Sequence, residues 1–255
     1  MVKFLQTNFS NWEKYQLDNN IIWISGPDKK KAFDICEKIC RESKPNLQFI
    51  GNLLKNINIH FGIIIISEKF VIGIVDSIRT QPIFWFKKNK DLFLSSKALK
   101  IAELNNLKVD KDQLLAFQMS GYTSGDKTLW TEVFSIPPGN IFFYDSKNEL
   151  LSFSKYIRYN PWKVRQFKDF DYYNSTLKKE IKNLLSRIVE KADGKRILVP
   201  LSAGLDSRLI ASGLKKVKYD NVECFSYGLK NNYEIIAGEK IAQKLDYKWN
   251  KIEIN

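Results

Sequence analysis

The chain has 255 residues, of which 44% are hydrophobic, and a formal net charge of +13. This length fits one large or two modest domains with a hydrophobic core, and the absence of low-complexity blocks indicates a globular protein. No segment approaches the roughly 20 uninterrupted apolar residues that span a bilayer, and the N-terminal stretch lacks the apolar centre of a signal peptide. We therefore expect a cytoplasmic protein without a membrane partner.

The excess of basic residues raises the question of nucleic-acid binding. The lysines are dispersed along the whole length, and short clusters such as Lys29-Lys30-Lys31 and Lys87-Lys88 are interrupted by acidic or apolar residues. No motif of a nucleic-acid-binding fold accompanies the charge, so we expect no nucleic-acid partner. Lysines that gather on one face would contradict this expectation.

The first helix is predicted over residues Lys30 to Arg41, where Cys36 and Cys40 share a face. A metal site would need more ligands, and His60 is the only histidine of the chain. The two cysteines are therefore interpreted as small buried side chains. Together with Cys224 they are compatible with a reducing compartment.

Residues 57–160 consist mainly of apolar runs bounded by turn residues, which is typical of strands. We predict strands over residues 61–66, 70–76, 82–86, 92–95 and 141–144. Lys88-Asn89-Lys90 is the expected tip of a hairpin, and a helix is predicted from Val109-Asp110 to Met119. Asn160-Pro161-Trp162 then predicts a linker between two domains, residues 1–160 and 161–255.

The second domain begins with a predicted packing helix, whose apolar face runs from Tyr173 to Ile188 and which ends near Asp193-Gly194. Strands are then predicted over residues 197–201, 222–228 and 249–254, with helices after the first two. The first of these helices is expected to start at a cap formed by Asp206 or Ser207. Alternating strands and helices indicate a doubly wound parallel sheet, which binds ligands beyond the carboxyl ends of its strands.

The segment Ser202-Ala203-Gly204-Leu205-Asp206-Ser207 joins the first of these strands to its helix. Small residues let the backbone approach phosphates, the hydroxyls of Ser202 and Ser207 can donate to phosphate oxygens, and the carboxylate of Asp206 can hold magnesium. It is not a Walker loop, because no Gly-Lys-Ser/Thr ends it. The alternative is an ordinary strand-to-helix turn that Asp206 caps.

This loop resembles SGGxDS, the pyrophosphate loop of the N-type ATP pyrophosphatases, which split ATP to AMP and pyrophosphate while they adenylate a carboxylate. Ala203 stands in place of a glycine, which the loop tolerates only if Ala203 keeps a negative φ. With the following Phe-Ser-Tyr-Gly strand, the segment resembles the asparagine synthetase family. The resemblance implies that Leu201 and Tyr227 contact the adenosine part of ATP, that Ser202 to Ser207 bind its phosphates, and that Mg²⁺ binds at Asp206.

The N-terminal half resembles the glutaminase domain of the same family, a class II glutamine amidotransferase-like (Ntn hydrolase-like) sandwich of two packed antiparallel sheets. The resemblance rests on the order of several features: Asp76, Arg79, Pro82, Phe84-Trp85-Phe86, Gly121-Tyr122 and Ile136 to Gly139. Each feature is weak alone, since Pro-Pro-Gly is also an ordinary turn.

The first fifty residues depart from that family. Class II glutaminases use an N-terminal cysteine as nucleophile, whereas removal of Met1 here would expose Val2. Neither Cys36 nor Cys40 can replace it, because neither is a chain terminus. We therefore expect this half to be a structural remnant without glutaminase activity.

The family's synthetase domain also continues beyond the third strand, whereas this chain stops at Asn255. A fragment of a longer product, a second polypeptide that completes the domain, and an inactive protein all remain open. The expected function is an asparagine synthetase-like, AMP-forming amide ligase that adenylates a small carboxylate for attack by ammonia or an amine. The alternative is a non-catalytic nucleotide-binding or assembly protein.

Overall fold

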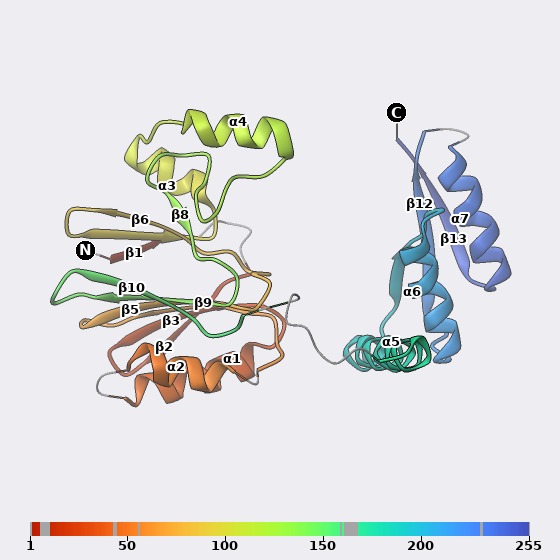
Figure 1. Ribbon diagram of the computed structural model, residues 1–255, viewed down its shortest axis with the longest axis horizontal. Helices are drawn as coiled ribbons and strands as arrows, with labels where there is room; N and C mark the ends of the chain where they lie inside the picture. The colour runs from red at the N-terminus through yellow and green to blue at the C-terminus, as the bar shows by residue number, and fades with distance from the viewer. Residues whose placement is uncertain are drawn as a thin grey trace. The chain divides into compact units, whose positions relative to one another are not determined.

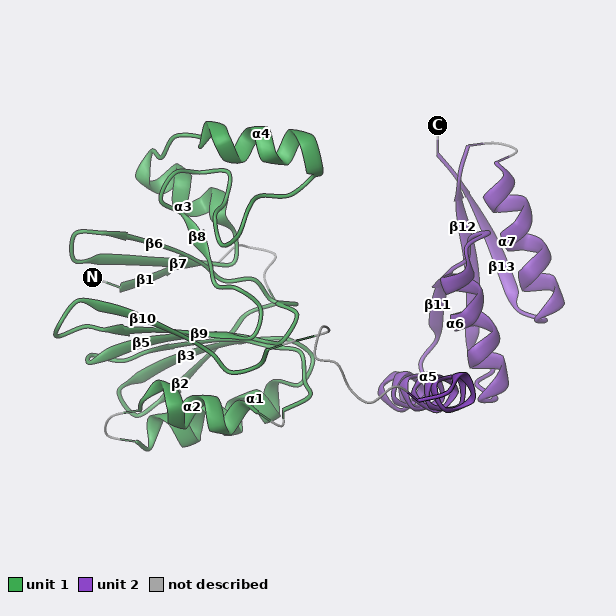
Figure 2. Cartoon of the chain, in the orientation of Figure 1, with its two compact units in different colours: residues 1–162 green, residues 163–255 purple. Residues whose placement is uncertain are grey.

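The computed structural model describes residues 2–5, 11–42, 45–55, 57–158, 160, 168–229 and 232–254. The chain forms two compact units, residues 1–162 and 163–255 (Figure 2). Pro161 and Trp162 of the expected linker lie outside the described residues. None of the described helices has the length and apolar character that crossing a membrane requires.

The first unit contains two β-sheets (Figure 1). The six-stranded sheet has the order β10-β9-β5-β4-β3-β2 and the four-stranded sheet the order β1-β7-β6-β8. The strands are β1 (Val2–Leu5), β2 (Glu13–Leu17), β3 (Asn20–Ser25), β4 (Gly62–Ile66), β5 (Phe70–Val75), β6 (Phe84–Lys88), β7 (Asp91–Ser95), β8 (Phe134–Ser135), β9 (Asn140–Asp145) and β10 (Leu150–Lys155). The helices are α1 (Lys29–Cys40), α2 (Leu47–Leu54), α3 (Ala98–Asn105) and α4 (Lys111–Ser120).

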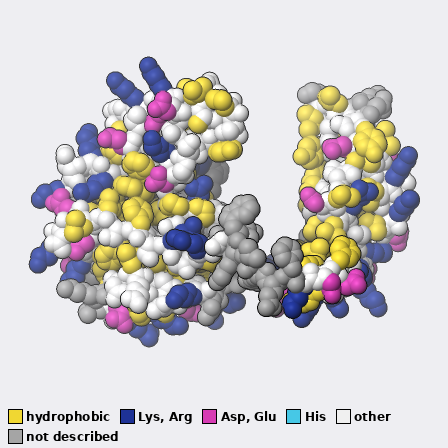
Figure 3. Space-filling view, viewed as in Figure 1, with side chains coloured by type: hydrophobic (Ala, Val, Ile, Leu, Met, Phe, Trp, Pro, Cys, Tyr) yellow, Lys and Arg dark blue, Asp and Glu magenta, His cyan; other side chains and the backbone are white. Residues whose placement is uncertain are grey.

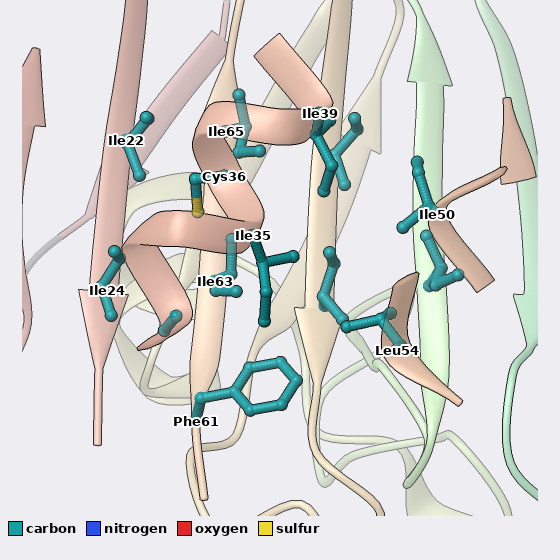
Figure 4. Packing of buried hydrophobic residues seen from close by; sticks show 14 of the residues in the cluster. Ile22, Ile24, Ile35, Cys36, Ile39, Ile50, Leu54, Phe61, Ile63 and Ile65 are labelled. Atoms are coloured by element: carbon teal, nitrogen blue, oxygen red, sulfur yellow. The ribbon is translucent and has the colours of Figure 1, made fainter. Parts of the chain in front are cut away.

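These elements stack as α1 and α2, the six-stranded sheet, the four-stranded sheet, and α3 with α4 (Figure 1). The alternation of side chains along β4 shows why. Ile63 and Ile65 pack with Cys36 of α1 in one buried cluster (Figure 4), whereas Ile64 packs with Leu92 between the sheets. Both faces of the sheet are therefore buried, which explains the uninterrupted isoleucine run in the sequence.

The structure confirms the predicted strands between residues 61 and 95 and the helix near residues 30–41, with small shifts at their ends. The sequence analysis missed β1, β2, β3, α2, α3, β8 and β10. The expectation of two antiparallel sheets was wrong for the smaller one, because β1 pairs in parallel with β7 and makes that sheet mixed. A parallel partner this distant in sequence leaves no local turn signal.

The second unit is a three-stranded parallel sheet covered by helices. Its strands are β11 (Ile197–Pro200), β12 (Val222–Gly228) and β13 (Lys248–Glu253), and its helices are α5 (Phe170–Ala192), α6 (Leu205–Lys216) and α7 (Tyr233–Lys244). The predicted parallel pairing is confirmed, and α5 ends at Asp193 in the left-handed conformation as expected. The strands β11, β12 and β13 lie in the sheet in the same order as in the sequence. The reversal of strand order that makes a sheet doubly wound is therefore not present among the described residues.

One face of this sheet is packed. Val199 and Cys224 form a buried cluster with Leu185 of α5, Leu214 of α6 and Ala242 of α7. The residues that alternate with them point the other way, and Tyr227 is 59% exposed there. The sheet therefore has a helix-covered face and a face that the described residues leave open.

Candidate functional site

The candidate loop begins where β11 ends, at Pro200, and α6 starts at Leu205 behind the N-cap Gly204. Asp206 and Ser207 thus belong to the first helical turn. The prediction that one of them caps the helix was wrong, because Gly204 is the N-cap and no side chain caps this end. The Ser207 hydroxyl accepts the N–H of Ser202 instead, at 3.2 Å.

Two serine side chains hold the loop together. The hydroxyl oxygens of Ser202 and Ser207 lie 3.1 Å apart, and the N–H of Gly204 donates to Ser202 Oγ at 3.1 Å. Ala203 is not among the residues with positive φ, so the condition for alanine at this position is met. The serine hydroxyls therefore shape the loop.

The N-terminus of α6 opens onto this loop. The N–H groups of the first turn have no acceptor inside a helix, and within the described part of the chain those of Leu205 and Asp206 make no hydrogen bond. The helix dipole adds partial positive charge at the same end. N–H donors, hydroxyls and dipole together can receive an anion such as a phosphate.

Asp206 is the candidate metal ligand, and its side chain is exposed in the first turn of α6. No group of three or more His, Cys, Asp or Glu residues able to hold a metal is found among the described residues. Asp206 could therefore supply one oxygen, and phosphates and water would have to supply the rest. Mg²⁺ fits such a site, because it usually keeps several waters and binds one or two carboxylates together with phosphates.

Leu201 and Tyr227, the expected adenosine contacts, lie at the carboxyl ends of neighbouring parallel strands. Leu201 is buried, and its N–H donates to the carbonyl oxygen of Phe225 at 2.7 Å. Its main-chain N–H is thus already used inside the sheet. Tyr227 is exposed, and the parallel pairing brings it to the same edge as the loop.

The sequence analysis missed Ser226, a buried residue whose hydroxyl bonds to the main chain that leads into the loop. Ser226 Oγ donates to the carbonyl oxygen of Leu201 at 2.6 Å and accepts from Trp249 Nε1 at 3.0 Å. Gly238 of α7 packs against the same oxygens. A glycine inside an otherwise helical segment was the available signal, because it often marks a close approach of two backbones.

Asp76 and Arg79, two of the features that suggested a glutaminase domain, lie in the connection between β5 and β6. The buried Asp76 carboxylate accepts hydrogen bonds from the N–H groups of Phe61 and Ile78, both at 3.0 Å, and from the hydroxyl of Thr80. Arg79 has φ of 56° and donates to Ser135 Oγ at 2.9 Å. These contacts fix the connection between β5 and β6.

The surroundings of Cys36 and Cys40 disfavour the reactive thiolate form of both cysteines. Cys36 is fully buried in the core, and burial raises the pKa of its thiol. Burial also raises the pKa of Cys40 to about 11. Both thiols therefore stay protonated near neutral pH, which disfavours attack on a substrate.

The surface shown in Figure 3 carries lysine and arginine side chains spread over both units, with acidic and apolar side chains between them. On this face the positive charge does not gather into one continuous patch.

Comparisons with known proteins give no family assignment. No protein-family model and no curated protein matches the chain. Among solved structures, an NH3-dependent NAD synthetase from Campylobacter jejuni aligns with 31% of this chain and 36% of its own length, at 20% identity and a TM-score of 0.28. The chain thus spans about a third of that enzyme.

Two further structures align with more of the chain but resemble it weakly. Glutamine phosphoribosylpyrophosphate amidotransferase from B. subtilis covers 93% of this chain and 72% of its own length, at 10% identity and a TM-score of 0.34. A structure described as the allosteric regulatory enzyme of purine biosynthesis covers 95% and 71%, at 10% identity and a TM-score of 0.35. Similarity at this level does not assign a family, and asparagine synthetase is not among these three proteins.

Proposed function

We propose that the chain binds MgATP at the loop Ser202 to Ser207 and serves an asparagine synthetase-like, AMP-forming amide ligation. In this reaction a carboxylate oxygen attacks the α-phosphorus of ATP, the bond to the β-phosphate breaks, and pyrophosphate leaves. Ammonia or an amine then attacks the acyl carbon and displaces AMP, which leaves an amide. The substrate would be a small carboxylic acid.

The observation that carries the proposal is the arrangement at the end of β11. Ser202 and Ser207 meet at the N-terminus of α6, where the N–H groups of Leu205 and Asp206 have no partner among the described residues. The loop follows a parallel strand, at the edge of the sheet where such folds bind ligands. Its chemistry suits phosphate oxygens, and Mg²⁺ bound beside Asp206 would offset the charge of the phosphates.

The proposal gives each of the two units a different role. We propose that residues 1–160 are an amidotransferase-like domain without glutaminase activity, and that residues 161–255 belong to an ATP pyrophosphatase-like domain. The open face of the three-stranded sheet is consistent with further protein being needed for the ligation, either a continuation of the same chain or a second polypeptide. A cytoplasmic location belongs to the same proposal.

The test is magnesium-dependent ATP binding by titration calorimetry on the full chain, with Asp206→Asn as the variant. The change keeps the size of the side chain and removes its charge, so the affinity for MgATP should fall about ten-fold. Asp220→Asn is the matched control, because Asp220 is also exposed and lies beyond the other end of α6. No binding by the unchanged chain, or equal affinity in the Asp206→Asn protein, would contradict the proposal.

A non-catalytic nucleotide-binding protein is the second candidate. Among the described residues no group of three or more His, Cys, Asp or Glu side chains is placed to hold a metal ion, which favours nucleotide binding without catalysis. Binding of MgATP without exchange of labelled pyrophosphate into ATP, in the presence of candidate carboxylic acids, would support this alternative.

A further inference from the structure

The strand β10 lies at one edge of the six-stranded sheet, and β9 is its only neighbour among the described strands. The N–H of Tyr156, which follows β10, donates to the carbonyl oxygen of Gly139 on the β9 side at 3.0 Å. Main-chain groups of successive residues in an antiparallel strand point alternately to its two sides. The N–H and C=O groups of Leu151, Phe153 and Lys155 therefore point away from β9, toward the open edge.

The edge of β10 lacks the features that usually prevent a sheet from pairing further. Protected edge strands are very short, charged, bulged or interrupted by proline. Residues 150–154 contain no charge and no proline, and they pair with β9 without a bulge. By contrast, β1 and β8 have four and two residues, and the opposite edge strand β2 begins with Glu13 and Lys14. Among the described edges of the first unit, β10 is therefore best suited to accept another strand.

Leu151 and Phe153 bring apolar side chains to this edge. Leu151 packs against the buried cluster between the two sheets. The ring centroid of Phe153 lies 5.8 Å from that of Trp85 and 5.4 Å from that of Phe142. Phe153 nevertheless remains 44% exposed at the edge. A strand added beside β10 would cover this ring and extend the buried layer between the sheets.

A second copy of β10 fits this edge in one antiparallel register. When Ser152 lies opposite Ser152 of the second copy, Leu151 lies opposite Phe153 of that copy. Leu151 and Phe153 both turn their main-chain groups outward, so this pair can exchange two N–H···O hydrogen bonds. Their side chains share one face of the strand, so the pair also makes an apolar contact across the two copies.

The charges that flank the apolar segment favour the same register. Glu149 precedes β10, and the exposed Lys155 ends it. In the antiparallel register each Glu149 lies opposite Lys155 of the second copy, and opposite charges in this position stabilise paired strands. A parallel copy in register would instead place Glu149 beside Glu149 and Lys155 beside Lys155. The charge pattern of this one segment is therefore complementary to itself in the antiparallel direction.

We propose that the protein forms a dimer in which the β10 strands of two copies pair antiparallel about a two-fold axis at Ser152. The two six-stranded sheets then become one continuous sheet. Such an interface uses the same surface on both copies and closes at two subunits. The inference concerns the first unit and does not depend on ATP binding at the loop of the second.

Ser152→Cys in the full chain tests the register. At the two-fold axis Ser152 forms a non-hydrogen-bonded pair with its copy, in which the Cα atoms lie about 4.5 Å apart. A disulfide spans this distance, so oxidised glutathione should convert the variant to a covalent dimer on non-reducing electrophoresis. Ser154→Cys is the matched control on the same strand and face, because it lies about 13 Å along the strand from its own copy. Equal cross-linking of the two variants, or none with Ser152→Cys, would overturn the proposal.

The mass of the full chain in solution tests the dimer itself. Sedimentation should give about twice the 29.8 kDa of one chain. Lys155→Glu places two acidic residues opposite each other at both ends and should raise the dissociation constant about ten-fold. The double change Glu149→Lys with Lys155→Glu exchanges the two signs and should restore the dimer. Lys147→Glu is the control, because Lys147 is exposed in the turn before β10 and carries the same charge.

Three results would overturn the proposal. A monomer at every concentration would leave this edge to a strand of a different protein. Assemblies larger than two chains would contradict an interface that closes at two. A dimer that Lys155→Glu and Lys147→Glu weaken equally would show that the pairing of Glu149 with Lys155 does not hold the copies together.

Discussion

The hydroxyl of Ser226 donates a 2.6 Å hydrogen bond to the carbonyl oxygen of Leu201. Both residues are buried, and the bond joins β12 to the residue that follows β11. Trp249 of β13 donates to the same hydroxyl at 3.0 Å, so the three parallel strands are linked beneath the candidate loop. The main chain leading into Ser202 is therefore positioned by side chains distant in sequence.

We expect Ser226→Ala to lower the free energy of unfolding by about 1–3 kcal/mol, because it removes the hydrogen-bond partner of the buried Leu201 and of the half-buried Trp249 indole. Urea denaturation would measure the loss. Ser212→Ala is the control: Ser212 is exposed on α6, and its change should cost about 0.5 kcal/mol or less. Equal losses in the two variants would show that the Ser226 network contributes no special stability.

Substitution by alanine should have opposite effects on the free energy of unfolding at two helical glycines, Gly238 and Gly51. A Cβ at Gly238 would lie 2.9 Å from the carbonyl oxygen of Leu201 and closer still to Ser226 Oγ. Gly238→Ala should therefore lower the free energy of unfolding by about 1–3 kcal/mol, although alanine favours a helix. At Gly51 of α2 the nearest atom is Tyr156 Cβ at 3.7 Å, so Gly51→Ala should raise stability by about 0.5–1 kcal/mol.

Thermal or urea unfolding of the two variants checks this pair. Stabilisation by Gly238→Ala would contradict the close packing of α7 against the end of β11. A large loss in Gly51→Ala would contradict the space described beside α2.

Thiol labelling tests the interpretation of the cysteines. Burial raises the pKa of Cys36, and it raises the pKa values of Cys40 and Cys224 to about 11. At about pH 8.5, the ordinary pKa of a free cysteine, these thiols should remain protonated in the native protein and react slowly with iodoacetamide. The rate at Cys40, which is partly exposed, should rise as the pH approaches its raised pKa.

Mass spectrometry after timed labelling would give the rates. Unfolding in urea should remove the burial and make all three cysteines react at the rate of a peptide thiol. Rapid labelling of native Cys36 would show that it is not buried in the core between α1 and the six-stranded sheet.

Much of the framework of both units could be predicted from local sequence. The isoleucine runs of β4 and β5 are continuous because both faces of their sheet are buried, and Phe70–Val75 is therefore recognisable as a strand. The helix α5 ends at Asp193 followed by Gly194, both with positive φ, which is a stop signal in the residues themselves. The small residues between β11 and α6 likewise mark a tight connection. These features depend on neighbours along the chain, so one sequence suffices to see them.

Tertiary structure alone decided which distant segments meet. β1 is too short to predict from four residues, and its parallel pairing with β7 depends on a partner about 90 residues away. The N-cap is Gly204 rather than the predicted Asp206 or Ser207, and the Ser207 hydroxyl instead accepts the N–H of Ser202. The hydrogen bond from Ser226 to Leu201, and the need for glycine at position 238, arise only where β11, β12 and α7 pack together. Side-chain periodicity reports which face of an element is buried, but not what lies against that face.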